Sequence, residues 1–245
     1  MIDFRNQDCM EGMKEFPNDY FDLAIVDPPY GISVTSRHKV GKSKTELVGG
    51  RARPFGGFGK TRMQGGSRKS FTKQKVYHSF DDERPPDENY FNELFRVSKN
   101  QIIWGGNYLL DFLGRCTCMI VWDKGRRNLD QADCEIAWTS LSGQSRIFEF
   151  KWNGMLQGDM KNKEYRIHPT QKPVALYEWL LSKYAAPGDK ILDTHVGSAS
   201  SLIACHKLRM DAVGFEIDKT MYDMAKKRLD AELAQMNIFD FMEIT

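Results

Sequence analysis

Short apolar runs alternate along the chain with longer stretches in which apolar residues recur every three or four positions. The runs have the length of buried strands, and they span 21–27, 101–106, 118–122, 189–193 and 210–218. The longer stretches have helical spacing, and they span 172–188, 198–209 and 218–235, the last with Asp218 as its expected N-cap. This alternation predicts an α/β fold built on a mostly parallel sheet.

Residues 35–78 interrupt this pattern. They contain twelve Lys or Arg, eight Gly and a single acid, Glu46, so the segment carries a charge of +11 in a chain whose net charge is +2. Such an asymmetry favours a polyanionic partner, and the segment is too long for an ordinary connection. The alternative interpretation is a solvated basic loop without a specific partner.

The rest of the composition argues against several classes of protein. No apolar stretch approaches the roughly 20 residues of a transmembrane helix, and the N-terminus, with Asp3, lacks the apolar core of a signal peptide. The five cysteines are scattered and include no CxxC pair, which argues against a disulfide framework and a metal site. We therefore expect a cytoplasmic protein with no membrane span and no bound metal.

The first candidate site is the tetrad Asp27-Pro28-Pro29-Tyr30, at the end of the run 21–27. Ligands of open α/β sheets bind at the carboxyl ends of strands. The two prolines fix φ and remove N–H donors, so the turn presents a carboxylate, bare carbonyls and an aromatic ring. This set suits a planar ligand with an exocyclic amino group, although a strand-terminating turn with a surface tyrosine would have the same sequence.

The second candidate site is ILDTHVGSASS, residues 191–201, where an expected strand ends at Asp193 and a loop of small residues opens a helix. The next expected strand carries Glu216, placed to accept hydrogen bonds from ribose hydroxyls. Only Gly197 remains of a GxGxxG pattern, which favours an adenosyl ligand over a dinucleotide. A generic turn between strand and helix is the alternative.

Four motifs occur with the tetrad first and the loop of small residues after it: DPPYGISV (27–34), HPTQKPVAL (168–176), ILDTHVGSASS (191–201) and GFEID (214–218). With them the sequence resembles the amino-methylating DNA methyltransferases that use S-adenosylmethionine, in the circularly permuted β group. The resemblance covers nearly the whole chain outside 35–80. It implies a single methyltransferase domain over 1–245, with helices on both faces of a mostly parallel Rossmann-like sheet and a long basic insertion at 35–78.

The resemblance also implies roles for individual residues. Asp8 and Cys9 would line the adenine pocket, and the HPTQKP segment would lie near the methionine end of the cofactor. The expected cofactor-binding residues are Asp8, Cys9, Asp27, His168, Thr170, Lys172, Asp193, Thr194, His195, Gly197, Ser198 and Glu216. Thr194, His195 and Ala199 depart from the common Asp-Pro-Phe-x-Gly-Ser-Gly loop, which bears on the affinity for the cofactor.

The resemblance implies that the tetrad Asp27, Pro28, Pro29 and Tyr30 catalyses direct methyl transfer to a base flipped out of double-stranded DNA. The basic segment and the stretch 122–139 would bind the DNA. The alternative for 122–139 is a solvated hairpin loop between two strands. The expected DNA-binding residues are Lys42, Lys44, Arg51, Arg53, Lys60, Arg62, Arg68, Lys69, Lys124, Arg126 and Arg127.

We expect transfer to adenine N6, because Asp-Pro-Pro-Tyr resembles adenine enzymes more than the Ser-Pro-Pro-Tyr of many N4-cytosine enzymes. N4-cytosine transfer is one alternative, and an RNA or protein amino-methyltransferase is another, for which Asn-Pro-Pro-Tyr is more usual. A DNA-binding module that has lost catalysis is the alternative from a different class. A homodimer and a cognate restriction endonuclease remain open as partners.

Overall fold

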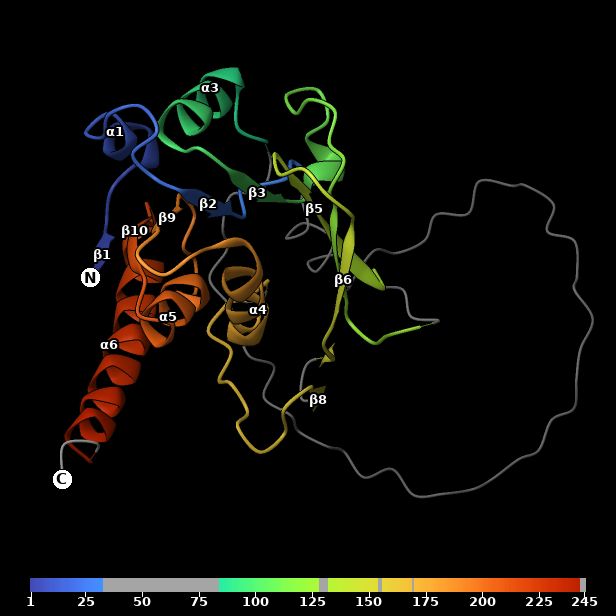
Figure 1. Ribbon diagram of the computed structural model, residues 1–245. Coiled ribbons are helices and arrows are strands. Elements are labelled where there is room, and N and C mark those ends of the chain that lie inside the picture. The colour runs from blue at the N-terminus through green and yellow to red at the C-terminus, as the bar shows by residue number, and fades with distance from the viewer. Residues whose placement is uncertain (33–83, 128–131, 154–155, 169, 243–245) are drawn as a thin grey trace, which may run out of the picture.

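The computed structural model describes residues 1–32, 84–127, 132–153, 156–168 and 170–242. An eight-stranded sheet forms the centre, in the order β1-β10-β9-β2-β3-β5-β4-β6 (Figure 1). The first five strands in this order are parallel, β5 is antiparallel to both of its neighbours, and β6 is parallel to β4. The strands are β1 (Ile2–Arg5), β2 (Leu23–Val26), β3 (Gln101–Trp104), β4 (Ile120–Asp123), β5 (Cys134–Thr139), β6 (Arg146–Glu149), β9 (Lys190–Asp193) and β10 (Asp211–Phe215), and β7 (Trp152–Asn153) pairs separately with β8 (Leu156–Gln157).

Helices cover both faces of the sheet. α1 (Cys9–Met13) and α3 (Glu88–Val97) lie on one face, and α4 (Val174–Tyr184), α5 (Ser200–Lys207) and α6 (Lys219–Met242) lie on the other (Figure 1). This arrangement confirms the expected Rossmann-like α/β fold. The basic segment 35–78 lies outside the described residues.

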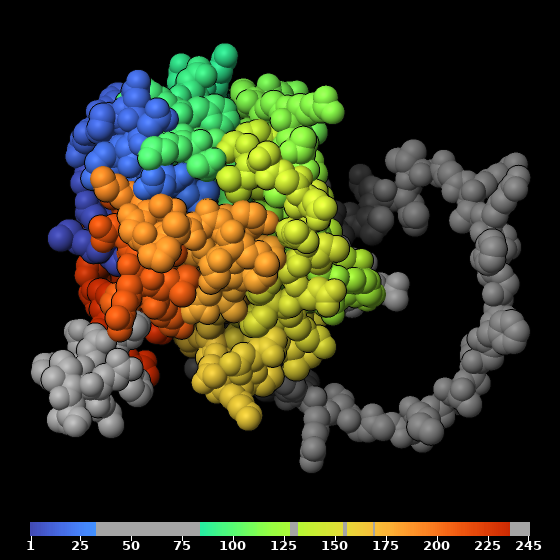
Figure 2. All heavy atoms as spheres, viewed as in Figure 1, coloured from blue at the N-terminus to red at the C-terminus, as the bar shows by residue number. Residues whose placement is uncertain are grey.

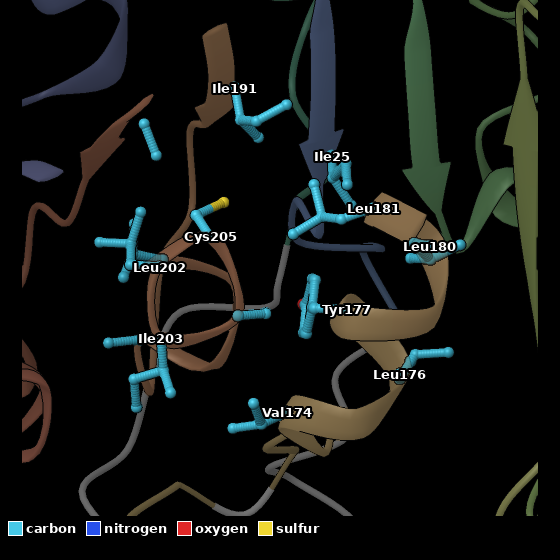
Figure 3. Close-up of a cluster of buried hydrophobic side chains, with 14 of the residues drawn as sticks. Ile25, Val174, Leu176, Tyr177, Leu180, Leu181, Ile191, Leu202, Ile203 and Cys205 are labelled. Atoms are coloured by element: carbon cyan, nitrogen blue, oxygen red, sulfur yellow. The ribbon is translucent and has the colours of Figure 1, made fainter. Parts of the chain in front are cut away.

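The central strand β2 shows why both faces must be covered. All four of its residues are buried. Because successive side chains of a strand point to opposite faces, Leu23 and Ile25 pack with α4 and α5, whereas Ala24 and Val26 pack with α3. Figure 3 shows the first of these two cores, in which Tyr177 and Leu181 of α4 face Ile25.

The structure confirms the five strands expected from the apolar runs and the three expected helices, as β2, β3, β4, β9, β10, α4, α5 and α6. Asp218 precedes α6 and accepts a hydrogen bond from the backbone N–H of Met221 at 2.8 Å, as expected of an N-cap. β1, α1, α3 and β6 were not anticipated from the sequence, whereas the antiparallel pair of β4 and β5 matches the alternative interpretation of 122–139 as a hairpin. Among the described helices, none is both long and apolar enough to cross a membrane.

The parallel order places distant segments side by side. Leu23 of β2 lies opposite Ile191 of β9, and in Figure 2 the blue N-terminal residues accordingly adjoin the orange ones. Four neighbouring parallel strands, β1, β10, β9 and β2, therefore end at one edge of the sheet. The candidate residues lie at this edge.

Candidate active site

Four carboxylates follow or end the four neighbouring parallel strands: Asp8, Glu216, Asp193 and Asp27, in the order of the strands. Asp8 caps α1 by accepting a hydrogen bond from the N–H of Met10 at 2.7 Å. The structure thus gathers acids that are as far as 208 positions apart in the printed sequence. Gathering negative charges at one edge is costly unless cations approach them, so the edge is suited to a positively charged ligand.

Asp193 shows this cost most clearly. Its side chain is buried and accepts hydrogen bonds from the Ser201 hydroxyl and from the backbone N–H of His195. Burial, together with repulsion from Asp27 and Glu216, nevertheless raises the pKa of Asp193 to about 7. A bound cation would favour its ionised form.

Glu216 lies at the end of β10, where its carboxylate bridges two segments. Oε2 accepts a hydrogen bond from the N–H of Gly197 at 3.0 Å, and Oε1 accepts one from the N–H of Asp218 at 2.9 Å. Desolvation raises the pKa of Glu216 above its usual range despite these donors. A Cβ built on Gly197 would meet nothing closer than 3.9 Å, so the loop backbone faces open space in which a ligand could approach it.

The residues that depart from the common loop are accommodated by their surroundings. Ala199 adopts a left-handed conformation, with φ of 62°, that normally favours glycine, but its methyl group is completely buried. His195 packs edge-on against the ring of Tyr90, with the ring centroids 5.4 Å apart, and burial lowers its pKa to about 4. Thr194 is buried beneath them, and its hydroxyl bonds that of Tyr90 at 2.7 Å. The imidazole is therefore a neutral aromatic ring, and unlike a phenyl group it also forms a hydrogen bond, between Nδ1 and the Thr194 hydroxyl at 2.9 Å.

Cys9 starts α1 beside this acidic edge. Burial, reinforced by the negative charge of Asp8, raises the pKa of the Cys9 thiol to about 12. The side chain is therefore neutral and apolar in character, which suits the wall of a pocket better than nucleophilic chemistry.

The tetrad Asp27-Pro28-Pro29-Tyr30 is contacted by Lys172. The ammonium group of Lys172 donates to Oδ2 of Asp27, and the hydroxyl of Tyr30 donates to Oδ1 of the same carboxylate. Lys172 Nζ also lies 3.4 Å from the Tyr30 hydroxyl oxygen, which closes a triangle of three polar groups. Lys172 was expected near the methionine end of a cofactor, and the structure places its ammonium group on the carboxylate of Asp27.

Tyr30 is fixed by a close backbone approach. A Cβ on Gly105 would lie 2.1 Å from the Tyr30 ring, and Gly105 has a positive φ of 68°, so glycine is required there for two reasons. The Tyr30 ring also stacks on Tyr108, with ring centroids 5.4 Å apart and planes inclined by 20°. Tyr108 is half exposed. A solvent-facing aromatic ring therefore lies next to the residue expected to stack on a base.

His168 and Thr170 form a local turn of the HPTQKP segment. The Thr170 backbone N–H donates to Nδ1 of the buried His168, at 3.3 Å. Since Nδ1 is the acceptor, the proton of the neutral ring lies on Nε2. Desolvation lowers the pKa of His168 to about 4, so the ring is neutral at pH 7.

A part-buried ion pair connects the chain just before the HPTQKP segment with the loop between β9 and α5. Arg228 of α6 donates to Oε2 of Glu164 at 2.6 Å and to the backbone carbonyl of Ser198 at 2.6 Å. Glu164 in turn accepts the first N–H of α4, from Val174, at 2.8 Å. Neither Arg228 nor Glu164 was anticipated, because the sequence gives no sign that α6 reaches these loops.

Comparison with known proteins assigns the family. A sequence model of the N6/N4 methyltransferase family, described as DNA methylase, matches residues 64–227, which is more than half of the chain. The chain belongs to this family. The structure is similar to that of the M1.HpyAVI–SAM complex, with a TM-score of 0.53 and 20% identity over 93% of this chain and 100% of that one, which shows a shared fold.

Two curated members of the methyltransferase class match part of the chain. The Type II methyltransferase M.HpaI of Haemophilus parainfluenzae is 42% identical over 82 residues, 34% of this chain and 25% of that protein. The Type II methyltransferase M2.DpnII of Streptococcus pneumoniae is 35% identical over 81 residues, 33% of this chain and 30% of that protein. The matched stretches thus span between a quarter and a third of these relatives.

For a member of the N6/N4 family, the expected DNA-binding residues of the stretch 122–139 need one correction. Lys124 is buried, and its ammonium group donates to Glu135 of β5 instead of facing a phosphate. Arg127 is exposed and pairs with Asp123, and Arg126 is partly buried. The eight cations between 41 and 72 lie outside the described residues.

We predict that Arg228→Met destabilises the fold by about 3 kcal/mol, because it leaves the part-buried Glu164 carboxylate without its cation. The measurement is urea denaturation at pH 7 followed by circular dichroism. Lys226→Met is the matched control, since Lys226 lies on the same helix in an exposed pair with Asp230. Equal midpoints for the two variants would contradict the structural role of the Arg228–Glu164 pair.

Proposed function

We propose that the chain is an S-adenosylmethionine-dependent DNA methyltransferase that modifies the N6 amino group of adenine. The proposal rests mainly on one observation. Asp27, which follows β2, lies at the same edge of the sheet as Asp193 and Glu216. Membership of the N6/N4 family supports the reaction class, and the Asp-Pro-Pro-Tyr form of the tetrad supports adenine. Double-stranded DNA would be the substrate.

The acidic edge fits S-adenosylmethionine on chemical grounds. The cofactor carries a positively charged sulfonium and would supply the methyl group when bound. Glu216, already held by the N–H groups of Gly197 and Asp218, retains lone pairs that can accept hydrogen bonds from ribose hydroxyls. Asp8, Cys9, Thr194 and His195 would surround the adenosine, and Gly197, Ser198, His168 and Thr170 would approach from the two loops.

The tetrad would prepare the base nitrogen as a nucleophile. The lone pair of an exocyclic amino group is conjugated with the ring, so the nitrogen attacks poorly while it is planar. Hydrogen bonds from its two N–H groups to Asp27 and to the Pro28 carbonyl favour a pyramidal nitrogen. Pro29 keeps the turn rigid, and Tyr30 would stack on the base. Positioning of this kind can lower a barrier by roughly 7–11 kcal/mol.

The described residues on either side of the stretch that contains the basic segment lie beside the tetrad. Gly31 follows Tyr30, and a Cβ on Gly31 would lie 2.6 Å from Cδ of Pro85. The chain therefore leaves the described structure at residue 32 and returns at residue 84 next to the catalytic turn. This attachment supports a role for the segment in holding DNA near the flipped base. A homodimer and a partner endonuclease stay predictions.

We predict that Asp27→Ala reduces methyl transfer to less than a tenth of the wild-type rate, because the amino group loses its charged acceptor. Lys172 keeps Glu135 as a partner in this variant, so the fold should persist. The measurement is transfer of tritiated methyl groups to unmethylated DNA, with calorimetric cofactor binding as the control. Mass spectrometry of the digested product distinguishes N6-methyladenine from N4-methylcytosine, and the absence of cofactor binding by the wild type would favour a DNA-binding module.

The raised pKa of Asp193 predicts a pH-dependent cofactor affinity. Below pH 7 the Asp193 carboxyl is protonated in the free protein, so binding of a cation must first release a proton. We expect the dissociation constant for S-adenosylmethionine to rise about tenfold from pH 8 to pH 6, as one group with this pKa requires. Calorimetry at the two pH values measures the change. Asp193→Asn should abolish it, and a variant that keeps the full pH dependence would contradict the assignment.

Deleting residues 41–72 should remove most of the DNA affinity while cofactor binding is retained. The deleted stretch holds eight cations, and four phosphate contacts among them would give a log–log salt slope of about −3.6. Fluorescence anisotropy of labelled duplex DNA at several salt concentrations measures affinity and slope. If the deletion variant binds DNA with the wild-type slope, the segment is a linker and the DNA surface lies elsewhere.

A further inference from the structure

A chain of four alternating charges runs from the β4–β5 hairpin to the catalytic turn. Lys124 pairs with Oε1 of Glu135, Oε2 of Glu135 lies 3.2 Å from Nζ of Lys172, and Lys172 pairs with Asp27. The side chains of Lys172 and Lys124 are only 3% and 11% exposed, and that of Glu135 is 25% exposed. With two cations and two carboxylates, this group of four side chains has no net charge.

The ammonium group of Lys172 faces three oxygen atoms, two as hydrogen-bond acceptors and the Glu135 oxygen as an ion-pair partner at 3.2 Å. These are Asp27 Oδ2, Glu135 Oε2 and, at 3.4 Å, the hydroxyl oxygen of Tyr30. The ring of Trp104 covers the group from another side, with its centroid 5.3 Å from Nζ. A long and flexible side chain is thereby confined to one position, and it confines the carboxylate of Asp27 in turn.

The two neighbouring ammonium groups keep the carboxyl group of Glu135 ionised. Burial alone would raise the pKa of Glu135, but the ammonium groups of Lys172 and Lys124 hold it well below its usual range. Its Oε2 is buried and accepts no hydrogen bond from the described residues, so the charge of the Lys172 ammonium group, 3.2 Å away, is what offsets its desolvation. The two groups depend on each other.

We propose that Glu135 is a positioning residue of the methyl-transfer reaction, which holds Lys172 on one oxygen of Asp27 so that the carboxylate keeps a single orientation toward the amino group of the target base. Without Glu135, the ammonium group is free to move across the carboxylate and compete with the base for both oxygens. Lys124 supports Glu135 from the far side and neutralises its remaining charge. The inference rests on the proposed function.

The test compares three variants: Glu135→Gln, Lys124→Met and the double variant K124M/E135Q. The double variant is the decisive one, because it removes one charge of each sign and leaves no buried cation unpaired. We expect it to melt near the wild-type temperature and to keep the cofactor dissociation constant within about threefold. Its methyl-transfer rate at saturating DNA and cofactor should fall on the order of 100-fold, the scale of a small misplacement in an active site.

Lys124→Met alone should lower the rate less than tenfold, since Glu135 then still holds Lys172. Glu93→Gln is the control for loss of an ion-paired carboxylate away from the site, because Glu93 pairs with Arg96 on α3, and it should react at the wild-type rate. A double variant as fast as the wild type would overturn the proposal. A double variant that loses rate but also melts at a clearly lower temperature and binds the cofactor more weakly would overturn it too, because Glu135 would then have a general structural role. A wild type that transfers no methyl group to any DNA would instead refute the proposed function.

Discussion

Parallel pairing of β2 with β9 is the constraint on which the site depends. The register sets Ala24 opposite Leu192, so the strands end together, and Asp27 and Asp193 emerge at the same edge. A shift of the register by one residue would turn Ala24 and Val26 toward α4 and Leu23 and Ile25 toward α3. Burial on both faces therefore fixes the positions of the two carboxylates through packing, without any direct bond between them.

The acids at this edge are treated differently by the fold. Asp27 receives an ammonium group from Lys172, and Lys172 is itself balanced by Glu135. Asp193 and Glu216 receive only neutral donors, a hydroxyl and backbone N–H groups. The negative charge is thus compensated at the catalytic turn and uncompensated at the neighbouring loop. In the proposed function, the uncompensated part faces the sulfonium cofactor and the compensated part faces the neutral base.

The sequence predicted the fold and the loops better than it predicted their supports. Strands with continuous apolar runs, such as β2 and β9, were recognised because both of their faces are buried. β6 was not, since this edge strand is largely exposed and has no continuous apolar run. Lys124 was expected on the surface because it lies among basic residues. Its burial depends on Glu135 of β5. The other ion-pair partner of Glu135 is Lys172, 37 positions later in the printed sequence.

The described residues before and after the long basic segment lie close together in the fold. Gly31 and Pro85 are neighbours, and α3 and β3 are formed by residues after 84. The core is therefore complete without a contribution from the segment. Loop-closure entropy grows only slowly with length, so a long insertion between such close ends destabilises the fold little more than a short one. The length of the insertion is therefore only weakly constrained by the stability of the core. In the proposed function, the strand ends would carry out the methyl transfer and the inserted basic residues would contact the DNA.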